Sequence, residues 1–284
     1  MKAGFIGLGN LGRAMAKRLI SQDVELVVWN RTREKAEELG VEVADSPASL
    51  LSEVDFVFLC LFDSNAVRSV ATGRDGLLSG ECEGKVIIDT TTNHFEAVAD
   101  FHRMFREKGA HYLEAPVLGS VVPASRGRLT VLVSGDRQAY ERALPYIDKI
   151  GEHIFYLGRP TLATRMKLIN NLVLGSFMAA IAEAVVLGEC AGLSREKVLE
   201  ILASGAGNSM VLNAKREKLQ NEDFSTHFSS ALIYKDLHYL QDLARVLKRP
   251  LFMGSTAKEL FALTFPKNLD ALDFSVVYRV LKEL

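Results

Sequence analysis

A glycine pattern near the N-terminus constrains the fold of this chain more than any other feature. Gly7, Gly9 and Gly12 follow a short apolar strand predicted over residues 3–6 and precede a helix predicted over residues 11–20. In this G-x-G-x-x-G spacing the first glycine permits a tight turn, the second lets the backbone approach a pyrophosphate, and the third lets the helix pack on the strand. The N–H groups at the helix start favour an anion. We therefore predict a dinucleotide-binding βαβ unit whose cofactor loop consists of Gly7, Leu8, Gly9, Asn10, Leu11 and Gly12.

The residues after the second predicted strand, over residues 24–29, indicate which dinucleotide binds. An acid at this position would accept a hydrogen bond from a ribose 2′-hydroxyl and repel a 2′-phosphate. Asn30, Arg31 and Thr32 stand there instead. The asparagine and the threonine can donate hydrogen bonds, and the guanidinium offers a charged fork and a plane that stacks on adenine. The sequence therefore predicts NADP(H) rather than NAD(H), with a solvated Arg31 at a helix start as the alternative.

Two patterns of secondary structure divide the chain. Apolar strands alternate with helical patterns up to residue 160; the strands are predicted over residues 3–6, 24–29, 56–61, 86–88, 112–113, 129–133 and 153–157. Such strands are typical of a parallel sheet covered by helices on both faces. After Pro160 the pattern is helical throughout. It includes a long helical stretch over residues 165–190, and we expect its most apolar part, residues 168–187, to be a buried helix. We predict an α/β dinucleotide-binding domain over residues 1–160 and an all-α domain for substrate binding and oligomerisation over residues 161–284.

Composition counts against several classes of protein. The net charge of −1 gives no general attraction to nucleic acid or to acidic membrane surfaces. The N-terminal apolar run is interrupted too early for a secretion signal, and no uninterrupted apolar run is long enough to predict a membrane span. Cys60, Cys82 and Cys190 lie far apart, which argues against disulfides and a zinc site. The histidines form no pair at ligand spacing, so we expect no metal. Because the separated cysteines fit a reducing compartment, we expect a cytoplasmic protein.

Four further segments, together with the glycine loop, occur in the order and spacing of one family. They are Asp89-Thr90-Thr91-Thr92, Glu114-Ala115-Pro116-Val117-Leu118-Gly119-Ser120, Lys167-Leu168-Ile169-Asn170-Asn171 and Lys235-Asp236. Over essentially its whole length the chain resembles the β-hydroxyacid dehydrogenases, which are 3-hydroxyisobutyrate dehydrogenase-like proteins, and is most similar to their glyoxylate and succinic semialdehyde reductases. The resemblance implies a Rossmann domain joined to a helical domain, an active site in the cleft between them, and homodimers or homotetramers formed by the helical half.

The resemblance also implies that Lys167 is the catalytic acid/base and that Asn171 orients the lysine or the substrate. Independently of the family, the two residues are four apart, so they share one face of a helix, and the lysine lies in an otherwise apolar stretch. When hydride reaches a carbonyl carbon, negative charge grows on the oxygen. An ammonium group stabilises that charge and supplies the proton. The alternative is a lysine exposed on a helix surface.

Two stretches are assigned to substrate and cofactor by position and by resemblance. Thr92 follows a strand at the carboxyl edge of the predicted sheet and, by resemblance, lies beside nicotinamide and substrate; a helix cap before residue 95 is the alternative. We expect the loop after Pro116 to hold a substrate carboxylate through backbone N–H groups. The residues of that loop are Leu118, Gly119 and Ser120. Leu118 replaces the usual serine of the family, which leaves the identity of the substrate open.

The remaining assignments follow the same reasoning. Phe228 matches a family aromatic beside the substrate, with a core phenylalanine as the alternative. By resemblance Lys235 reaches toward the cofactor and Asp236 shapes the substrate site, with an internal salt bridge as the alternative. Leu61 and Phe62 follow an apolar strand, and position alone places them along the cofactor path.

Together these observations predict an NADPH-dependent reductase of a small carboxylate-bearing aldehyde or 2-keto acid, of the glyoxylate or succinic semialdehyde class. Two alternatives stay open. An imine reductase shares the architecture and the Asn-Arg-Thr signature, but usually carries an acidic or phenolic residue where this chain has Lys167; the apolar Leu118 keeps this alternative open. The other is an NADP-binding scaffold without catalysis, against which the presence of Lys167 counts.

Overall fold

The chain forms two compact units. The computed structural model describes all of residues 1–284, and these divide into Met1–Lys167 (unit 1) and Leu168–Leu284 (unit 2). The division lies within helix α8 (Leu162–Cys190), later than the boundary expected at residue 160. Unit 1 therefore includes the first turns of a helix whose remainder belongs to unit 2.

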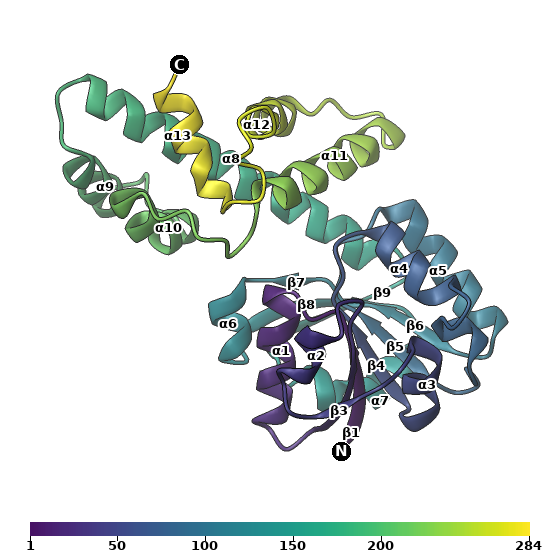
Figure 1. Cartoon of the computed structure of the whole chain (residues 1–284). Helices are drawn as coiled ribbons and strands as arrows, with labels where there is room; N and C mark the ends of the chain where they lie inside the picture. The colour runs from purple at the N-terminus through teal and green to yellow at the C-terminus, as the bar shows by residue number, and fades with distance from the viewer. The chain divides into compact units, whose positions relative to one another are not determined.

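Unit 1 is built on one nine-stranded sheet, ordered β3-β2-β1-β4-β5-β6-β8-β7, with β9 paired to β8 (Figure 1). The strands are β1 (Lys2–Ile6), β2 (Glu25–Trp29), β3 (Glu42–Val43), β4 (Phe56–Leu59), β5 (Val86–Asp89), β6 (His111–Glu114), β7 (Val117–Leu118), β8 (Leu129–Ser134) and β9 (Gly151–Gly158). The pairs among β1 to β6 are all parallel, as the apolar strands predicted.

The prediction of a parallel sheet is wrong at one edge. Strand β8 is antiparallel to β6 and to β7. A parallel return needs a crossover element that carries the chain back along the sheet. The only helix between β6 and β8 is the five-residue α6 (Val121–Ser125), which at about 1.5 Å per residue is too short for that return. Strand β9 is parallel to β8 again, because helix α7 (Arg137–Ile147) connects them.

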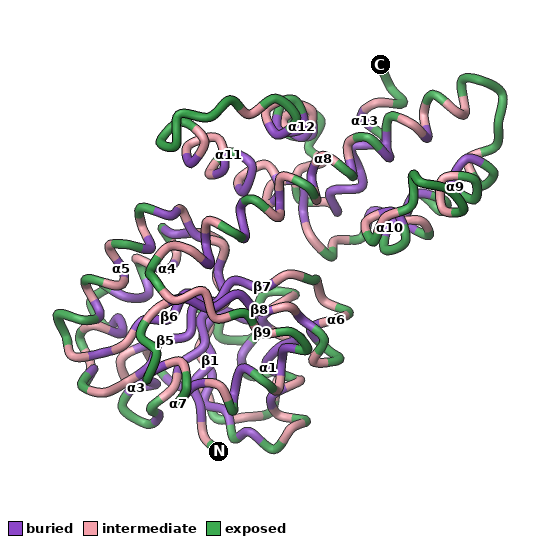
Figure 2. Tube along the Cα trace, turned by 180° about the vertical axis from the view of Figure 1, so that it is seen from behind, coloured by how far each residue is buried: buried purple, intermediate pink, exposed green.

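Helices cover both faces of the sheet, as predicted. Helices α1 (Asn10–Ile20), α6 and α7 contribute to one core layer, and α3 (Pro47–Glu53), α4 (Ser64–Thr72) and α5 (Phe95–Glu107) contribute to the other. Large apolar side chains fill both layers, including Met15 on one face and Phe101 on the other, both fully buried. Figure 2 shows the centre of the sheet as the most buried part of unit 1. The remaining helices of this unit are α2 (Glu34–Glu37) and η1 (Leu77–Ser79).

Unit 2 is entirely helical, which confirms the change of pattern after Pro160. Helix α9 packs against α10, and α11 packs against α12. After α8 the helices are α9 (Arg195–Ser204), α10 (Met210–Asn221), α11 (Ser230–Val246), α12 (Phe252–Ala262), η2 (Phe274–Val276) and α13 (Val277–Lys282).

Helix α8 is less buried than its sequence predicted. By length and composition alone it could cross a membrane, and 33% of its most apolar window is buried within the chain. Leu168, Met178 and Val185 lie on its buried side, whereas Val173 and Phe177 are 48% and 45% exposed. The prediction of a buried helix therefore holds for one face, and the other face presents apolar side chains to its surroundings.

Candidate active site

The glycine loop has the geometry that a dinucleotide requires. Gly7 has φ 98°, and a Cβ there would meet Cys60 O at 2.3 Å; a Cβ on Gly12 would meet Gly7 O at 2.0 Å. At Gly9, the N-cap residue of α1, a Cβ would have no neighbour within 4 Å. Two glycines are therefore required by packing, while the third leaves open space at the start of a helix. Since an anion is favoured at that position, the loop fits a pyrophosphate.

Asn30 holds this loop rather than facing outward. Its Oδ1 accepts a hydrogen bond from Leu8 N at 2.9 Å, and its Nδ2 donates to Thr32 O at 2.7 Å. One of the two N–H donors of the Asn30 amide is therefore used within the chain. Arg31 and Thr32 are exposed beside it. Arg31 makes no ion pair, whereas Arg13 pairs with Glu38.

Asp89, a buried carboxylate in a motif where the sequence analysis assigned this residue no role, organises the loops after β4 and β5. Asp89 accepts hydrogen bonds from Tyr112 Oη at 2.6 Å, Asn93 Nδ2 at 2.8 Å and Thr91 N at 2.9 Å. Burial raises the pKa of Asp89, and these hydrogen bonds oppose the shift. Thr91 Oγ1 in turn accepts from Leu61 N at 2.9 Å, so the network joins two loops at the carboxyl edge of the sheet. An acid at the end of an apolar strand was the available signal.

The predicted residues on these two loops lie at that same edge. Thr92 is half-buried, and the N-cap of α5 is His94, whose side chain accepts from Glu96 N; the alternative of Thr92 as that cap is therefore wrong. Leu61 is half-buried beside Gly7, since a Cβ on that glycine would meet the leucine side chain at 2.8 Å. Phe62 is 54% exposed.

The segment after Pro116 differs from the loop that we expected. Val117 and Leu118 form strand β7, in which Leu118 is the register partner of Thr130. The backbone of Leu118 is thus part of a ladder and not of an open nest of N–H groups. Gly119 follows with φ 122°, and Ser120 is the N-cap residue of α6. Gly119 and Ser120 lie where the chain leaves the sheet.

Lys167 is buried in unit 1 on the second turn of α8. It is 7% exposed, and its Nζ donates a hydrogen bond to Val117 O at 2.8 Å. The alternative of a lysine exposed on a helix surface is therefore wrong. The carbonyl of Val117 lies in the segment that follows the carboxyl end of β6. The Lys167 amine therefore lies at the same end of the sheet as the glycine loop and the Asp89 network.

Three predicted site residues of unit 2 form one network. Asn171, fully buried one turn after Lys167 on α8, donates through Nδ2 to Asp236 Oδ2 at 2.6 Å. The other oxygen of Asp236 lies 3.2 Å from Lys235 Nζ. The internal salt bridge considered as an alternative for Lys235 is thus present, and Asp236 orients the Asn171 amide.

Phe228 directly precedes Ser229, the N-cap residue of helix α11. It is half-buried against Phe274, with the ring centroids 5.6 Å apart. Asp273 accepts hydrogen bonds from the backbone N–H groups of Phe228 and of His227, each at 3.2 Å. The position of Phe228 is therefore set by a buried acid in a distant part of unit 2.

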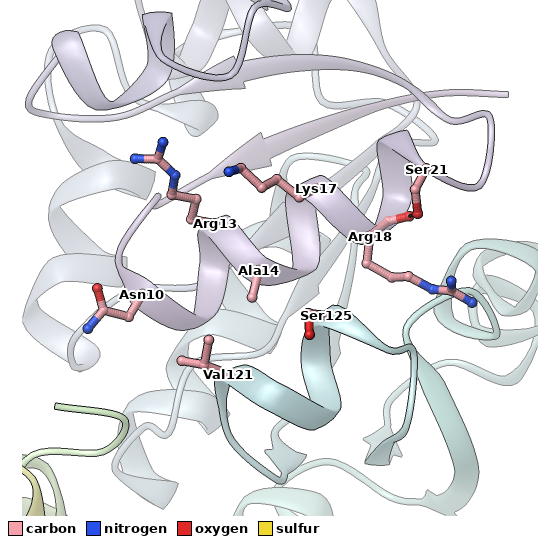
Figure 3. Close-up of a pocket in the computed structure, with 8 residues that line it drawn as sticks. All are labelled: Asn10, Arg13, Ala14, Lys17, Arg18, Ser21, Val121 and Ser125. Atoms are coloured by element: carbon pink, nitrogen blue, oxygen red, sulfur yellow. Dashed lines mark hydrogen bonds between the residues drawn. The ribbon is translucent and has the colours of Figure 1, made fainter. Parts of the chain in front are cut away.

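A groove that the sequence reasoning did not anticipate runs between α1 and α6 (Figure 3). It has a volume of about 380 Å³ and is lined from α1 mainly by basic and small residues. Arg18 Nε donates to Lys149 O at 3.0 Å, so part of its basic lining stabilises unit 1. Asn10 places one end of the groove at the glycine loop.

Family models match nearly the whole chain. Residues 2–158 match the NAD binding domain of 6-phosphogluconate dehydrogenase, and residues 162–281 match the NAD-binding domain of NADP-dependent 3-hydroxyisobutyrate dehydrogenase. These matches and the geometry of the glycine loop agree on an NAD(P)-binding protein.

Individual relatives cover the same length. The chain is 33% identical over 285 residues to glyoxylate/succinic semialdehyde reductase 1 of Arabidopsis thaliana, with 99% of each chain covered. It is also 33% identical over 281 residues to cytokine-like nuclear factor N-PAC of Homo sapiens, covering 98% of this chain and 51% of that relative. Among solved structures, one described as Psf3 in complex with NADP+ and 2-OPP has a TM-score of 0.90 at 28% identity, with 98% and 99% of the chains covered.

Proposed function

Because the chain belongs to the 3-hydroxyisobutyrate dehydrogenase-like family of NAD(P)-dependent oxidoreductases, we propose that it reduces a small aldehyde or 2-keto acid with NADPH. The substrate class that we favour is that of glyoxylate and succinic semialdehyde, which the name of the Arabidopsis relative supports. The product is the corresponding hydroxy acid. The observation that carries the proposal is the buried Lys167, with its amine held by Val117 O at 2.8 Å.

The cofactor preference rests on the residues after β2. No acid stands at the ribose position, and Arg31 is exposed with no partner carboxylate. The Asn30 amide is used to hold Leu8, so we assign recognition of the 2′-phosphate to Arg31 and Thr32. When bound, NADPH supplies the hydride.

Lys167 provides the proton chemistry. As the substrate carbonyl gains negative charge on oxygen, the Lys167 ammonium stabilises that charge and then donates a proton to the oxygen. Val117 O accepts one of the three N–H donors of the ammonium and so fixes its direction. In the reverse reaction the neutral amine takes the proton of the alcohol.

Asn171 and Asp236 assist by orientation. Asp236 Oδ2 accepts from Asn171 Nδ2 at 2.6 Å, which fixes the amide of a residue one helical turn from Lys167. Lys235 lies 3.2 Å from the other carboxylate oxygen and balances the charge of Asp236, which is 1% exposed. Since a buried carboxylate needs such partners, the network keeps Asn171 in one orientation.

The decisive experiment follows NADPH oxidation by the purified protein and by Lys167→Ala. The substrates are glyoxylate, succinic semialdehyde and a cyclic imine, and a reaction without substrate is the blank. We expect turnover with at least one carbonyl acid, and a loss of kcat of about a hundredfold or more in Lys167→Ala, the range of general acid catalysis. The Kd for NADPH, measured by fluorescence, should stay within about threefold, because only proton transfer is removed.

The matched control is Lys108→Ala, which removes an exposed lysine after α5 and should leave kcat unchanged. Activity on the imine alone would overturn the proposal in favour of imine reduction. Tight NADPH binding with no turnover of any substrate would favour a scaffold without catalysis. Full activity in Lys167→Ala would remove the lysine from the mechanism.

A further inference from the structure

Helix α8 begins at a backbone turn that is unusual for its residue. Thr161 has φ 73°, a left-handed value that a β-branched residue adopts only when surrounding contacts hold it. Its carbonyl accepts the first helical hydrogen bond, from Arg165 N at 2.9 Å, so Thr161 is the N-cap residue of the helix. The N–H groups of the first turn therefore need acceptors from outside the helix.

Those acceptors come from the sheet. The Glu114 carboxylate accepts hydrogen bonds from Thr161 N and, at 2.8 Å, from Thr164 N. Ser134 Oγ accepts from Ala163 N at 3.1 Å. Usually the side chain of the N-cap residue itself satisfies such N–H groups. Here two side chains distant in sequence do so, and they fasten the helix start to the sheet.

The two acceptors act at a single point of the sheet. Glu114 and Ser134 are register partners on the antiparallel strands β6 and β8. Both are buried, at 1% and 0% exposure. A buried carboxylate with two N–H donors is a charge-assisted contact, and it lies at the positive end of the helix dipole.

The position of Lys167 depends on this contact. Lys167 follows Thr161 by fewer than two helical turns, so a rotation at the helix start would carry its amine around the helix axis by the same angle. The amine contacts Val117 O, which belongs to the backbone just after Glu114. The segment from Glu114 to Val117 thus holds α8 both at its first residue and at the lysine.

We propose that Glu114 is a positioning residue for Lys167. Its carboxylate, helped by Ser134, holds the left-handed turn at Thr161 and so sets the direction in which the lysine amine points. This inference rests on the proposed role of Lys167 as proton donor. A carboxylate is needed because each of its two oxygens accepts a hydrogen bond from a backbone N–H group. In a glutamine, an NH2 group would replace one of these oxygens and would face one of the two backbone N–H donors, with which it cannot form a hydrogen bond.

The test is a double-mutant cycle with Glu114→Gln and Lys167→Ala, singly and together, in the full-length protein. We expect Glu114→Gln to lower kcat at least tenfold, which corresponds to about 1.4 kcal/mol, while the Kd for NADPH stays within about twofold. In the Lys167→Ala background the same change should alter kcat by less than about twofold, because its effect acts through the lysine. A purely structural role would not give this non-additivity.

Three more variants complete the test. Thr161→Gly permits the left-handed turn without a side chain, so it should restore part of the kcat lost in Glu114→Gln. Ser134→Ala removes only the acceptor of Ala163 N and should give a smaller loss of kcat; it serves if Glu114→Gln does not fold. Glu107→Gln makes the same chemical change at an exposed site and should leave kcat unchanged.

The outcomes separate the two proposals. If Lys167→Ala lowers kcat strongly but Glu114→Gln leaves kcat unchanged, or lowers it by the same factor in both backgrounds, the positioning role is wrong and the proposed function stands. The positioning role is also wrong if Glu114→Gln and Ser134→Ala each lose kcat only because the variant does not fold. If Lys167→Ala keeps full activity, the proton-donor role of Lys167 and the positioning role of Glu114 both fail, while the reductase activity itself stands.

Discussion

Arg31 and Arg33 are two positions apart in sequence, but only Arg33 forms ion pairs within the chain. Arg33 pairs with Glu37 at 3.0 Å and with Asp45 at 3.1 Å, and its pKa is raised by these hydrogen bonds. Arg31 has no such partner and is exposed. The guanidinium available for a 2′-phosphate is therefore that of Arg31.

We predict that Arg31→Ala weakens NADPH binding about tenfold or more and NADH binding much less. A hydrogen bond to a charged group contributes about 1.5–3 kcal/mol, and only NADPH carries the 2′-phosphate. The measurement is the Kd of each cofactor by fluorescence titration. Arg33→Ala is the matched control and should change both Kd values little. Equal weakening of NADPH and NADH in Arg31→Ala would refute the assignment.

At this scale the sequence did not specify which atoms the predicted site residues contact. The predicted cofactor residue Asn30 also accepts a hydrogen bond from Leu8 N and donates one to Thr32 O, two contacts that its position in the sequence did not indicate. Glu114 belongs to a motif that the sequence analysis singled out, but its partners Thr161 and Thr164 are distant in sequence. Such pairings depend on strand order, which no local pattern specifies.

Among the elements of unit 2, the loop that carries Phe228 depends on a buried ion pair. Asp273, which is fully buried, caps η2 and lies 2.8 Å from Lys215 Nζ. Its oxygens also accept from the N–H groups of the Phe228 loop. Burial alone would raise the pKa of Asp273, but the Lys215 ammonium and these hydrogen bonds hold it below the ordinary value of 3.8. The stabilisation that the charged carboxylate provides is present above about pH 4 and is lost as the pH falls through the pKa of the folded state.

We predict that Asp273→Asn lowers the free energy of unfolding by about 3 kcal/mol at neutral pH, because it leaves the buried Lys215 without its counter-charge. Between neutral pH and about pH 3 the variant should lose less stability than the parent protein, since the titrating carboxylate is gone. Urea unfolding at both pH values measures this. Glu283→Gln, which breaks the exposed pair with Lys267, is the control and should have little effect. Identical pH dependence of parent and variant would contradict the prediction.

Elements that carry several apolar positions were predicted, whereas strands β3 and β7 were not. Strands such as β1 and helices such as α8 and α11 carry several apolar positions at the expected spacing. The two-residue strands β3 and β7 are too short to show any period. Missing β7 led to two errors, an open loop in place of a strand at Leu118 and a parallel edge in place of an antiparallel one.

For the whole molecule, the order of an α/β half and an all-α half followed from the change of period near Pro160. The sequence did not distinguish apolar residues that are buried within the chain from apolar residues that stay exposed on its surface. Helix α8 contains both kinds, because its apolar residues extend beyond the one stripe that unit 2 buries.

The exposed apolar residues of α8 form one stripe. Ile169, Val173 and Phe177 are four apart in sequence, which places them on the same helix face, and they are 42%, 48% and 45% exposed. A contiguous apolar face of this kind is typical of a protein–protein contact. We predict that two copies of the chain bury this face against each other, as the family resemblance also implies.

Light scattering at micromolar concentration should therefore give the mass of a dimer or a tetramer. Val173→Glu places a charge in the centre of the stripe, where burial without a partner is unfavourable, and should shift the protein to a monomer. Ser52→Glu adds the same charge at an exposed position of α3 and should leave the mass unchanged. A parent protein that is monomeric without detergent would contradict the prediction, and the apolar stripe would then need another partner. A Val173→Glu variant that keeps the parent mass would place the contact between copies elsewhere on the chain.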